Sequence, residues 1–143
     1  MERDYLFLEK AIQIAVEAHM GQIDKAGKPY ILHPLRVMQN VSSTKAKIVA
    51  ILHDVIEDTT VTLDDLKNYG FDEDILYSLK LLTHKAGVPY MEYIENLKND
   101  AIAKEVKLAD LTDNMDITRL EELTDKDIKR IVKYKEAKLL LLR

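Results

Sequence analysis

Hydrophobic residues recur along this chain at the spacing of an α-helix. In most segments apolar residues stand three or four positions apart, which places them on one face of a helix, and no run alternates apolar and polar residues as a half-buried strand does. The pattern predicts an all-α fold, a compact bundle of about eight helices in one domain spanning residues 1–143. The expected helices cover approximately residues 3–20, 34–41, 45–58, 63–69, 73–82, 90–98, 101–115 and 125–142.

Short polar residues stand where several of these helices are expected to begin. Their side chains accept hydrogen bonds from the free N–H groups of a first helical turn. A Thr followed three positions later by an acidic residue resembles a capping box, here with Asp in place of Glu. The candidates are Ser42, Ser43, Thr44, Thr62 with Asp65, Asp72, and Thr124 with Asp127. Pro34 suits the start of another helix, and the segment 21–33 before it is rich in Gly and charged residues and is expected to be a loop.

Composition excludes several classes of protein. The chain has 143 residues, 47% of them hydrophobic and 32% charged, which is ordinary for a globular domain. A net charge of −4 argues against a nucleic-acid partner. The absence of Cys excludes disulfides and thiolate metal ligands. The charged N-terminus lacks a signal pattern and Leu139–Leu142 is too short to cross a bilayer, so we expect a cytoplasmic protein with no membrane partner. The sequence leaves the oligomeric state open.

One stretch concentrates candidate chemistry inside an apolar segment. His53, Asp54, Glu57 and Asp58 follow the apolar run 48–52, and neither Gly nor Pro interrupts them, so we expect them at the end of a buried helix. On a continuous helix His53 would lie near Glu57, and Asp54 near Asp58. Buried carboxylates need partners or a metal ion. The stretch therefore predicts a metal site; the simpler alternative is a polar helix end.

Further ligands for such an ion must come from elsewhere in the chain. There are four histidines, and one of them, His33, precedes Pro34 at a helix start, where its ring can turn back into a cleft or serve only structure. Asp110 follows an apolar helical face and would point inward, with Asp113 and Asn114 on the same side; a frayed helix end is the alternative. Two histidines with two aspartates suit Mn²⁺, Fe²⁺ or Zn²⁺.

Several short motifs occur in an order that resembles a known family. The motifs are Gly21-Gln22, Lys25, Gly27, Pro29-Tyr30-Ile31, His33-Pro34, His53-Asp54-x-x-Glu57-Asp58-Thr59, Val106-Lys107-Leu108-Ala109-Asp110 and Asn114-Met115. They resemble the HD-domain phosphohydrolases, specifically the hydrolase domain of the RelA/SpoT family and the stand-alone small alarmone hydrolases. The resemblance runs from about residue 5 to 140. It implies an all-helical HD-domain bundle, a Mn²⁺ ion, and hydrolysis of the 3′-pyrophosphate of ppGpp, a phosphorylated nucleotide.

The resemblance also implies roles for individual residues. The metal ligands it implies are His33, His53, Asp54 and Asp110. The acidic pair implied in water activation is Glu57 and Asp58. Nucleotide contacts are implied at Lys25, Asn114 and Tyr134, and a contact to substrate or to a ligand at His19. By their charge, Lys28 and Arg36 are further candidates for holding phosphate; solvated surface charge is the alternative for Lys25, Lys28 and Arg36.

Three positions depart from the family pattern. Asp24 stands where the family usually has an Arg that packs on guanine, Leu111 replaces an Arg, and Asp113 stands where His is common. We therefore expect an intact metal site with altered guanine recognition and weak ppGpp affinity. The expected function is that of a metal-dependent phosphohydrolase resembling ppGpp 3′-pyrophosphohydrolase. Two alternatives stay open, an HD phosphohydrolase for another nucleotide or phosphorylated cofactor and a non-catalytic binding module, but binding alone does not require Glu57 and Asp58.

Overall fold

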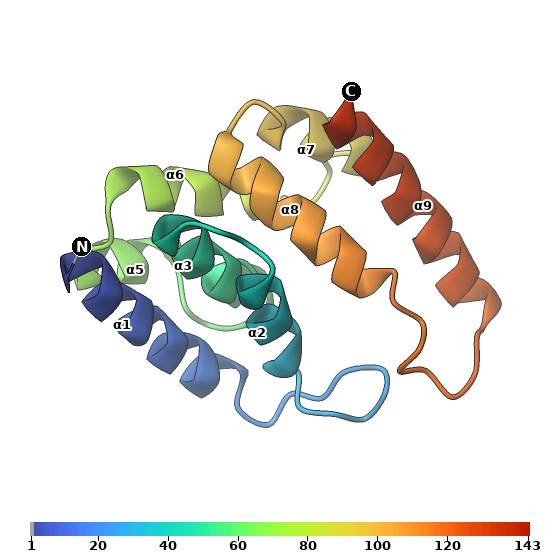
Figure 1. Ribbon diagram of the computed structural model, residues 1–143, viewed down its shortest axis with the longest axis horizontal. Helices are drawn as coiled ribbons and strands as arrows, with labels where there is room; N and C mark the ends of the chain where they lie inside the picture. Colours follow the sequence, from blue (N-terminus) through green and yellow to red (C-terminus); the bar gives the residue numbers. More distant parts are fainter. Residues whose placement is uncertain (1) are drawn as a thin grey trace.

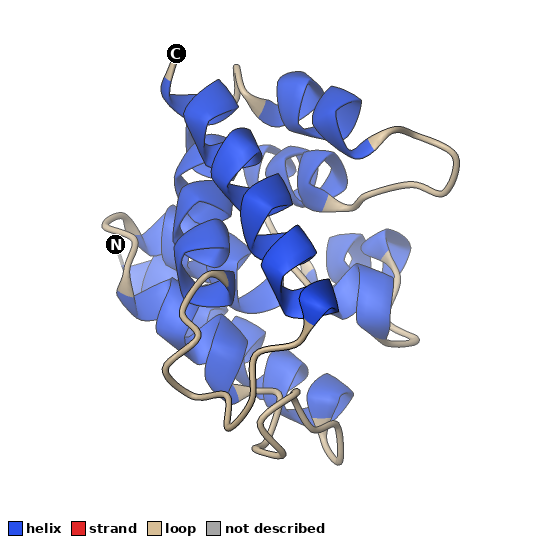
Figure 2. Ribbon diagram, turned by 90° about the vertical axis from the view of Figure 1, so that its right-hand side faces the viewer, coloured by secondary structure: helices blue, strands red, loops and turns tan. Residues whose placement is uncertain are grey.

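The computed structural model describes residues 2–143, and within them it forms nine α-helices and no strand, which confirms the all-α prediction (Figures 1 and 2). The helices are α1 (Glu2–His19), α2 (Leu32–Gln39), α3 (Thr44–Leu52), α4 (Val55–Asp58), α5 (Leu63–Tyr69), α6 (Glu73–Leu82), α7 (Tyr90–Leu97), α8 (Ala101–Asn114) and α9 (Asp125–Leu142). None of the helices in this part of the chain has the length and apolar character needed to span a membrane.

Helix α3 lies at the centre of the bundle. It packs against α1, α2, α6 and α8, and its residues from Ile48 to Leu52 are all fully buried. A helix that is apolar on every side is stable only when neighbours cover it all round. Burying one Leu or Ile side chain contributes about 1.5–3 kcal/mol. This burial carries the C-terminal end of α3, and the His53 that follows it, into the interior.

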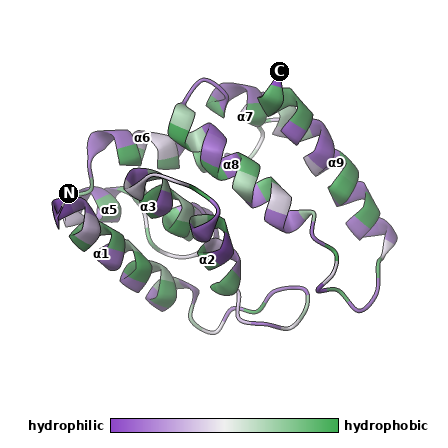
Figure 3. Cartoon of the chain, viewed as in Figure 1, coloured by the Kyte–Doolittle hydropathy of each residue, from purple (hydrophilic) through white to green (hydrophobic). Residues whose placement is uncertain are grey.

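The outer helices are amphipathic. Figure 3 shows hydrophobic and hydrophilic residues side by side around α1 and α9. Helix α9 packs on α7 and α8 and forms one side of the molecule (Figure 1). The loop between α1 and α2 and the loop between α8 and α9 reach the same end of the molecule (Figure 1). Residues from both loops line one pocket there.

Most of the expected helix starts are confirmed. The Ser43 side chain accepts the Ala46 N–H, and complete capping boxes form at Thr62 with Asp65 and at Thr124 with Asp127. The prediction for Asp72 is wrong in its detail: the residue occupies the N-cap position of α6 but makes no side-chain cap bond. Its carboxylate accepts a hydrogen bond from Arg3 instead, at 2.8 Å, because α1 brings that guanidinium within reach.

The expected continuous helix through Asp58 is wrong. Helix α3 ends at Leu52, His53 and Asp54 form a turn, and the single-turn helix α4 follows, which accounts for the ninth helix. The Ala50 carbonyl accepts both the backbone N–H and the Nδ1–H of His53. In a continuous helix this carbonyl would serve the N–H of residue 54. The local turn places the His53 Nε2 and the Asp54 carboxylate 3.1 Å apart.

Candidate metal centre

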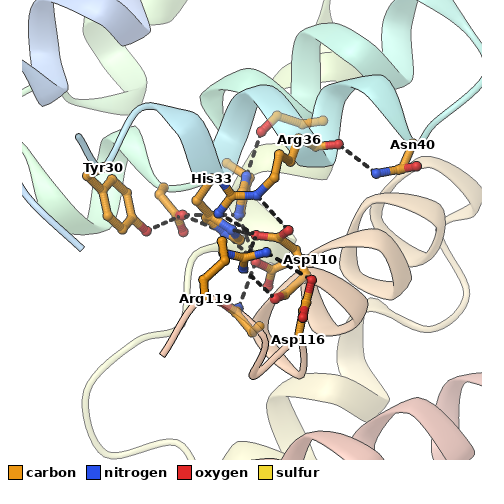
Figure 4. Close-up of polar contacts among 12 residues, drawn as sticks. Tyr30, His33, Arg36, Asn40, Asp110, Asp116 and Arg119 are labelled. Carbon is orange, nitrogen blue, oxygen red and sulfur yellow. Dashed lines mark hydrogen bonds and ion pairs between the residues drawn. The ribbon is translucent and has the colours of Figure 1, made fainter. Parts of the chain in front are cut away.

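Four side chains from three parts of the chain meet at one point. His33 comes from α2, His53 and Asp54 from the turn after α3, and Asp110 from α8. One nitrogen or oxygen from each lies within 4.8 Å of the corresponding atoms of the others. Asp110 Oδ1 is 2.9 Å from His33 Nε2 and 3.2 Å from His53 Nε2. The structure thus brings together all four residues for which the sequence predicted metal binding, and Figure 4 shows His33 and Asp110 converging.

The charges at this point are concentrated in buried surroundings. Burial raises the pKa of Asp110, but the Lys107 and His53 charges outweigh it and hold that pKa well below the ordinary value. Burial lowers the pKa of His33, but hydrogen bonds to Asp110 and Asp113 outweigh it and raise that pKa to about 9. Without an ion, protonated imidazoles neutralise the carboxylates. A divalent cation supplies the same positive charge in one ion, so the donor set fits a metal.

Neighbouring groups hold the two carboxylates in place. The Tyr30 hydroxyl donates to Asp54 Oδ2 at 2.6 Å. Lys107 Nζ donates to Asp110 Oδ2 at 3.0 Å, and Asn114 Nδ2 donates to Asp110 Oδ1 at 3.1 Å. Partners of this kind orient metal ligands and tune their basicity. Asn114, expected to contact the nucleotide, therefore also orients a candidate ligand.

Asp113 is a further partner of the centre, and sequence reasoning missed its role. Its carboxylate accepts the His33 Nδ1–H at 2.6 Å. It also accepts hydrogen bonds from Arg36 Nε and Nη2, at 2.8 and 3.1 Å. Burial raises the pKa of Asp113, but the hydrogen bonds from His33 and Arg36 outweigh it and lower that pKa far below the ordinary value. The one available signal was its spacing, because a residue three positions after Asp110 shares its helix face.

Known proteins resemble this chain over much of its length. No family model matches it. The guanosine-3′,5′-bis(diphosphate) 3′-pyrophosphohydrolase of Aquifex aeolicus is 31% identical over 120 residues, 76% of this chain and 17% of that protein. The protein of the same name in Haemophilus influenzae is 35% identical over 116 residues, 71% of this chain and 17% of that protein. The chain thus spans less than a fifth of the length of these curated relatives.

A solved structure resembles the fold. It is described as a metazoan ortholog of SpoT that hydrolyzes ppGpp, and it matches 96% of this chain and 85% of its own with a TM-score of 0.77 at 24% identity. The chain belongs to the RelA/SpoT-type HD-domain family.

In this HD domain the acidic pair lies one turn beyond the centre, on α4. The Glu57 carboxylate accepts the backbone N–H of His84, which anchors it to the segment between α6 and α7. Partial desolvation raises the pKa of Glu57 and of Asp58, and the nearby negative charge of Asp54 raises both further. Both carboxyl groups therefore hold a proton more readily than ordinary surface acids.

A pocket of about 500 Å³ opens beside the centre of the HD domain. Among the residues expected to bind substrate, Lys25, Asn114 and Tyr134 line it, whereas Lys28 is exposed on the loop and is not part of the pocket wall. Partial burial lowers the pKa of Lys25, and the positive charge of Arg130 lowers it further. The full lining is Ile23, Asp24, Lys25, Ala26, Tyr30, His33, Arg36, Asp113, Asn114, Asp116, Arg119, Leu120, Arg130 and Tyr134.

Two loop-side residues take positions that their sequence context did not reveal. The Asp24 Oδ1 accepts the backbone N–H groups of Ala26 and Lys28, both at 2.9 Å, so the carboxylate orders its own loop while lining the pocket. His19 is buried behind Tyr30, with ring centroids 5.1 Å apart. The His19 Nδ1 pairs with the Gln22 side chain at 2.9 Å. His19 thus supports the loop and the tyrosine that holds Asp54.

Proposed function

We propose that this HD domain is a metal-dependent phosphohydrolase acting on a phosphorylated nucleotide, with ppGpp as its substrate and release of pyrophosphate as its reaction. The observation that carries the proposal is the convergence of two imidazoles and two carboxylates within 4.8 Å. The relatives are named ppGpp 3′-pyrophosphohydrolases, and this supports the substrate class.

In this proposal the cofactor is Mn²⁺, held by His33, His53, Asp54 and Asp110. The donors are imidazoles and carboxylates, and the chain has no Cys. Such a set suits Mn²⁺ better than it suits a structural Zn²⁺ ion. When bound, the ion lowers the pKa of water and offsets negative charge on the phosphoryl oxygens. The protein holds the ligand side chains in place through hydrogen bonds: Tyr30 donates to Asp54, and Lys107 and Asn114 donate to Asp110.

In the proposed mechanism, Glu57 and Asp58 accept the proton of the attacking water. An attacking water must lose a proton, and a carboxylate within hydrogen-bond reach accelerates the reaction by accepting it. The raised pKa of both groups brings them closer to neutral pH, where a base is most effective. The hydrogen bond from the His84 N–H holds the Glu57 carboxylate in one orientation.

The substrate occupies the pocket beside the centre. Lys25 from the loop and Arg130 from α9 both line it. The positive charge of Arg130 helps to lower the pKa of Lys25, a repulsion that an anionic phosphate would relieve. The ring of Tyr134 provides an apolar wall for a base or ribose. Asp24 replaces the family's arginine, so we propose that ppGpp binds weakly.

A nucleotide panel tests the proposal. Pyrophosphate and phosphate release would be measured with Mn²⁺ for ppGpp, nucleoside phosphates, a sugar-nucleotide pyrophosphate and a phosphorylated dinucleotide cofactor. We expect pyrophosphate from ppGpp, lost in His53→Ala and retained in the control Asp64→Asn, which changes an exposed acid on α5. Release from another compound alone would make this a phosphohydrolase of different specificity. Binding without release from any compound would make it a non-catalytic module.

A further inference from the structure

Asp113 joins the candidate centre to the wall of the pocket. Only 9% of its side chain is exposed. It accepts the His33 Nδ1–H at 2.6 Å, while the opposite ring nitrogen, Nε2, lies 2.9 Å from Asp110 Oδ1 inside the centre. The imidazole is thus clamped at both nitrogens, with Nδ1 toward Asp113 and Nε2 toward the other three candidate ligands.

Two arginines fix the Asp113 carboxylate itself. Arg36 from α2 makes two hydrogen bonds to it, at 2.8 and 3.1 Å. Arg119, from the loop after α8, places Nη2 3.5 Å from Oδ2 and donates to the Asp113 carbonyl at 3.1 Å. Figure 4 shows Arg36 and Arg119 close to His33 and Asp110. A carboxylate held by a two-pronged guanidinium contact stays ionised and keeps one orientation.

We propose that Asp113 is a positioning residue of the metal centre, which keeps His33 in the tautomer and orientation that present Nε2 to the ion. The proposal rests on the metal site proposed above. A carboxylate that accepts the distal N–H of a ligating imidazole fixes its tautomer, orients its ring and raises its basicity.

The chain offers a matched control in Asp116. This residue lies at the same end of α8, also pairs with Arg119, at 3.0 Å, and lines the same pocket. Its side chain is 40% exposed, and it accepts hydrogen bonds from the side chains of Arg119 and Thr118. Removing it deletes a negative charge close to the centre without removing the acceptor for His33 Nδ1–H. Comparing the two variants separates positioning of His33 from general electrostatics.

The first measurement is Mn²⁺ binding to the metal-free protein by calorimetry. We expect Asp113→Ala to weaken Mn²⁺ affinity by roughly 10–100-fold, the usual cost of losing such a partner, and Asp113→Asn to weaken it less because its amide oxygen still accepts Nδ1–H. Asp116→Ala should bind Mn²⁺ as the wild type does. Equal weakening in Asp113→Ala and Asp116→Ala would overturn the proposal, because charge alone would then explain it.

A spectroscopic readout separates positioning from a purely structural role. In the protein loaded with diamagnetic Zn²⁺, the His33 Nδ1–H should give a low-field proton resonance that moves upfield in Asp113→Ala and stays in Asp116→Ala. If Asp113 only braces Arg36 and Arg119, Asp113→Ala will lower the Tm of the metal-free protein and leave this resonance and Mn²⁺ affinity unchanged, which overturns the proposal. Absence of Mn²⁺ binding in the wild type would instead overturn the metal site, and both proposals with it.

Discussion

Glu57 and Asp58 differ from the four residues of the centre in their surroundings and in the role proposed for them. They are more exposed than the centre residues, yet desolvation and the charge of Asp54 raise the pKa of each. Below the raised pKa the carboxyl groups are protonated and cannot accept a proton. We therefore propose that Glu57 and Asp58 set the pH dependence of catalysis, whereas the four residues of the centre bind the metal.

The double variant Glu57→Gln with Asp58→Asn should lower kcat by about 10²–10⁴-fold and leave Mn²⁺ affinity unchanged, because loss of a general base has a cost of that size. In the wild type, kcat should fall as the pH drops through a range above that of ordinary carboxylic acids. Steady-state rates against pH, with calorimetry for the metal, check both points. Wild-type turnover in the double variant would remove the acidic pair from the mechanism.

Asp24 lines the pocket proposed for the nucleotide, and we propose that its negative charge weakens binding of a purine with its phosphates. Two like charges about 4 Å apart repel by roughly 1 kcal/mol even in water, and more in a cleft, while an Arg can stack and attract. Asp24→Arg should lower KM for ppGpp at fixed Mn²⁺. Asp24→Asn is the matched control, because its side-chain oxygen still accepts the Ala26 and Lys28 N–H groups. An unchanged KM in both variants would make Asp24 a loop residue only.

At the residue scale, the sequence predicted those functional residues that can be recognised from the residues next to them in the chain. His53 and Asp54 stand out because two metal-binding side chains follow an apolar run. The roles of Asp113 and Tyr30 were not predictable in this way. Each depends on a contact with a residue far along the chain, since Asp113 lies 80 positions from His33 and Tyr30 lies 24 positions from Asp54.

At the scale of helices, most starts were predictable, whereas the end of α3 was not. Capping depends on residues within one turn, so Ser43, Thr62 and Thr124 could be recognised locally. The break after Leu52 has no Gly or Pro to announce it. At the break the His53 ring donates its Nδ1–H to the Ala50 carbonyl, the acceptor that a continuous helix would use for the N–H of residue 54. A contact made by the ring in the folded structure is not visible in the local sequence pattern.

Helix α9 carries two pocket residues, Arg130 and Tyr134, and its N-terminus is fixed by the Thr124 capping box. Thr124→Ala should therefore destabilise the protein by about 0.5–2 kcal/mol and raise KM more than it lowers kcat. Thr124→Ser keeps the capping hydroxyl and should behave as the wild type. Denaturant unfolding with steady-state kinetics checks this; equal KM values in all three proteins would show that the pocket does not depend on the cap.

At the scale of the molecule, the helical class followed from the sequence, whereas the packing arrangement did not. Periodicity reports which face of a helix is buried but not which neighbour covers it. The structure shows α3 enclosed by α1, α2, α6 and α8. This packing brings His33, His53 and Asp110 together from separate helices and turns, so the candidate centre ties three parts of the bundle to one another.

Metal binding should consequently stabilise the whole fold. An ion that binds only the folded protein adds about 2.7 kcal/mol at a concentration 100 times its Kd, so Mn²⁺ should raise the Tm and a chelator should reverse the rise. In His53→Ala the Tm should not respond to Mn²⁺. Differential scanning calorimetry at several Mn²⁺ concentrations measures this, and a rise of equal size in His53→Ala would place the ion elsewhere.

X-ray diffraction from crystals grown with Mn²⁺ would show whether His33, His53, Asp54 and Asp110 bind the ion. An anomalous-difference map should show one strong peak within ligand distance of His33 Nε2, His53 Nε2 and a carboxylate oxygen of each of Asp54 and Asp110. A map with no peak there, while these four side chains still contact one another, would show that they do not form a metal site.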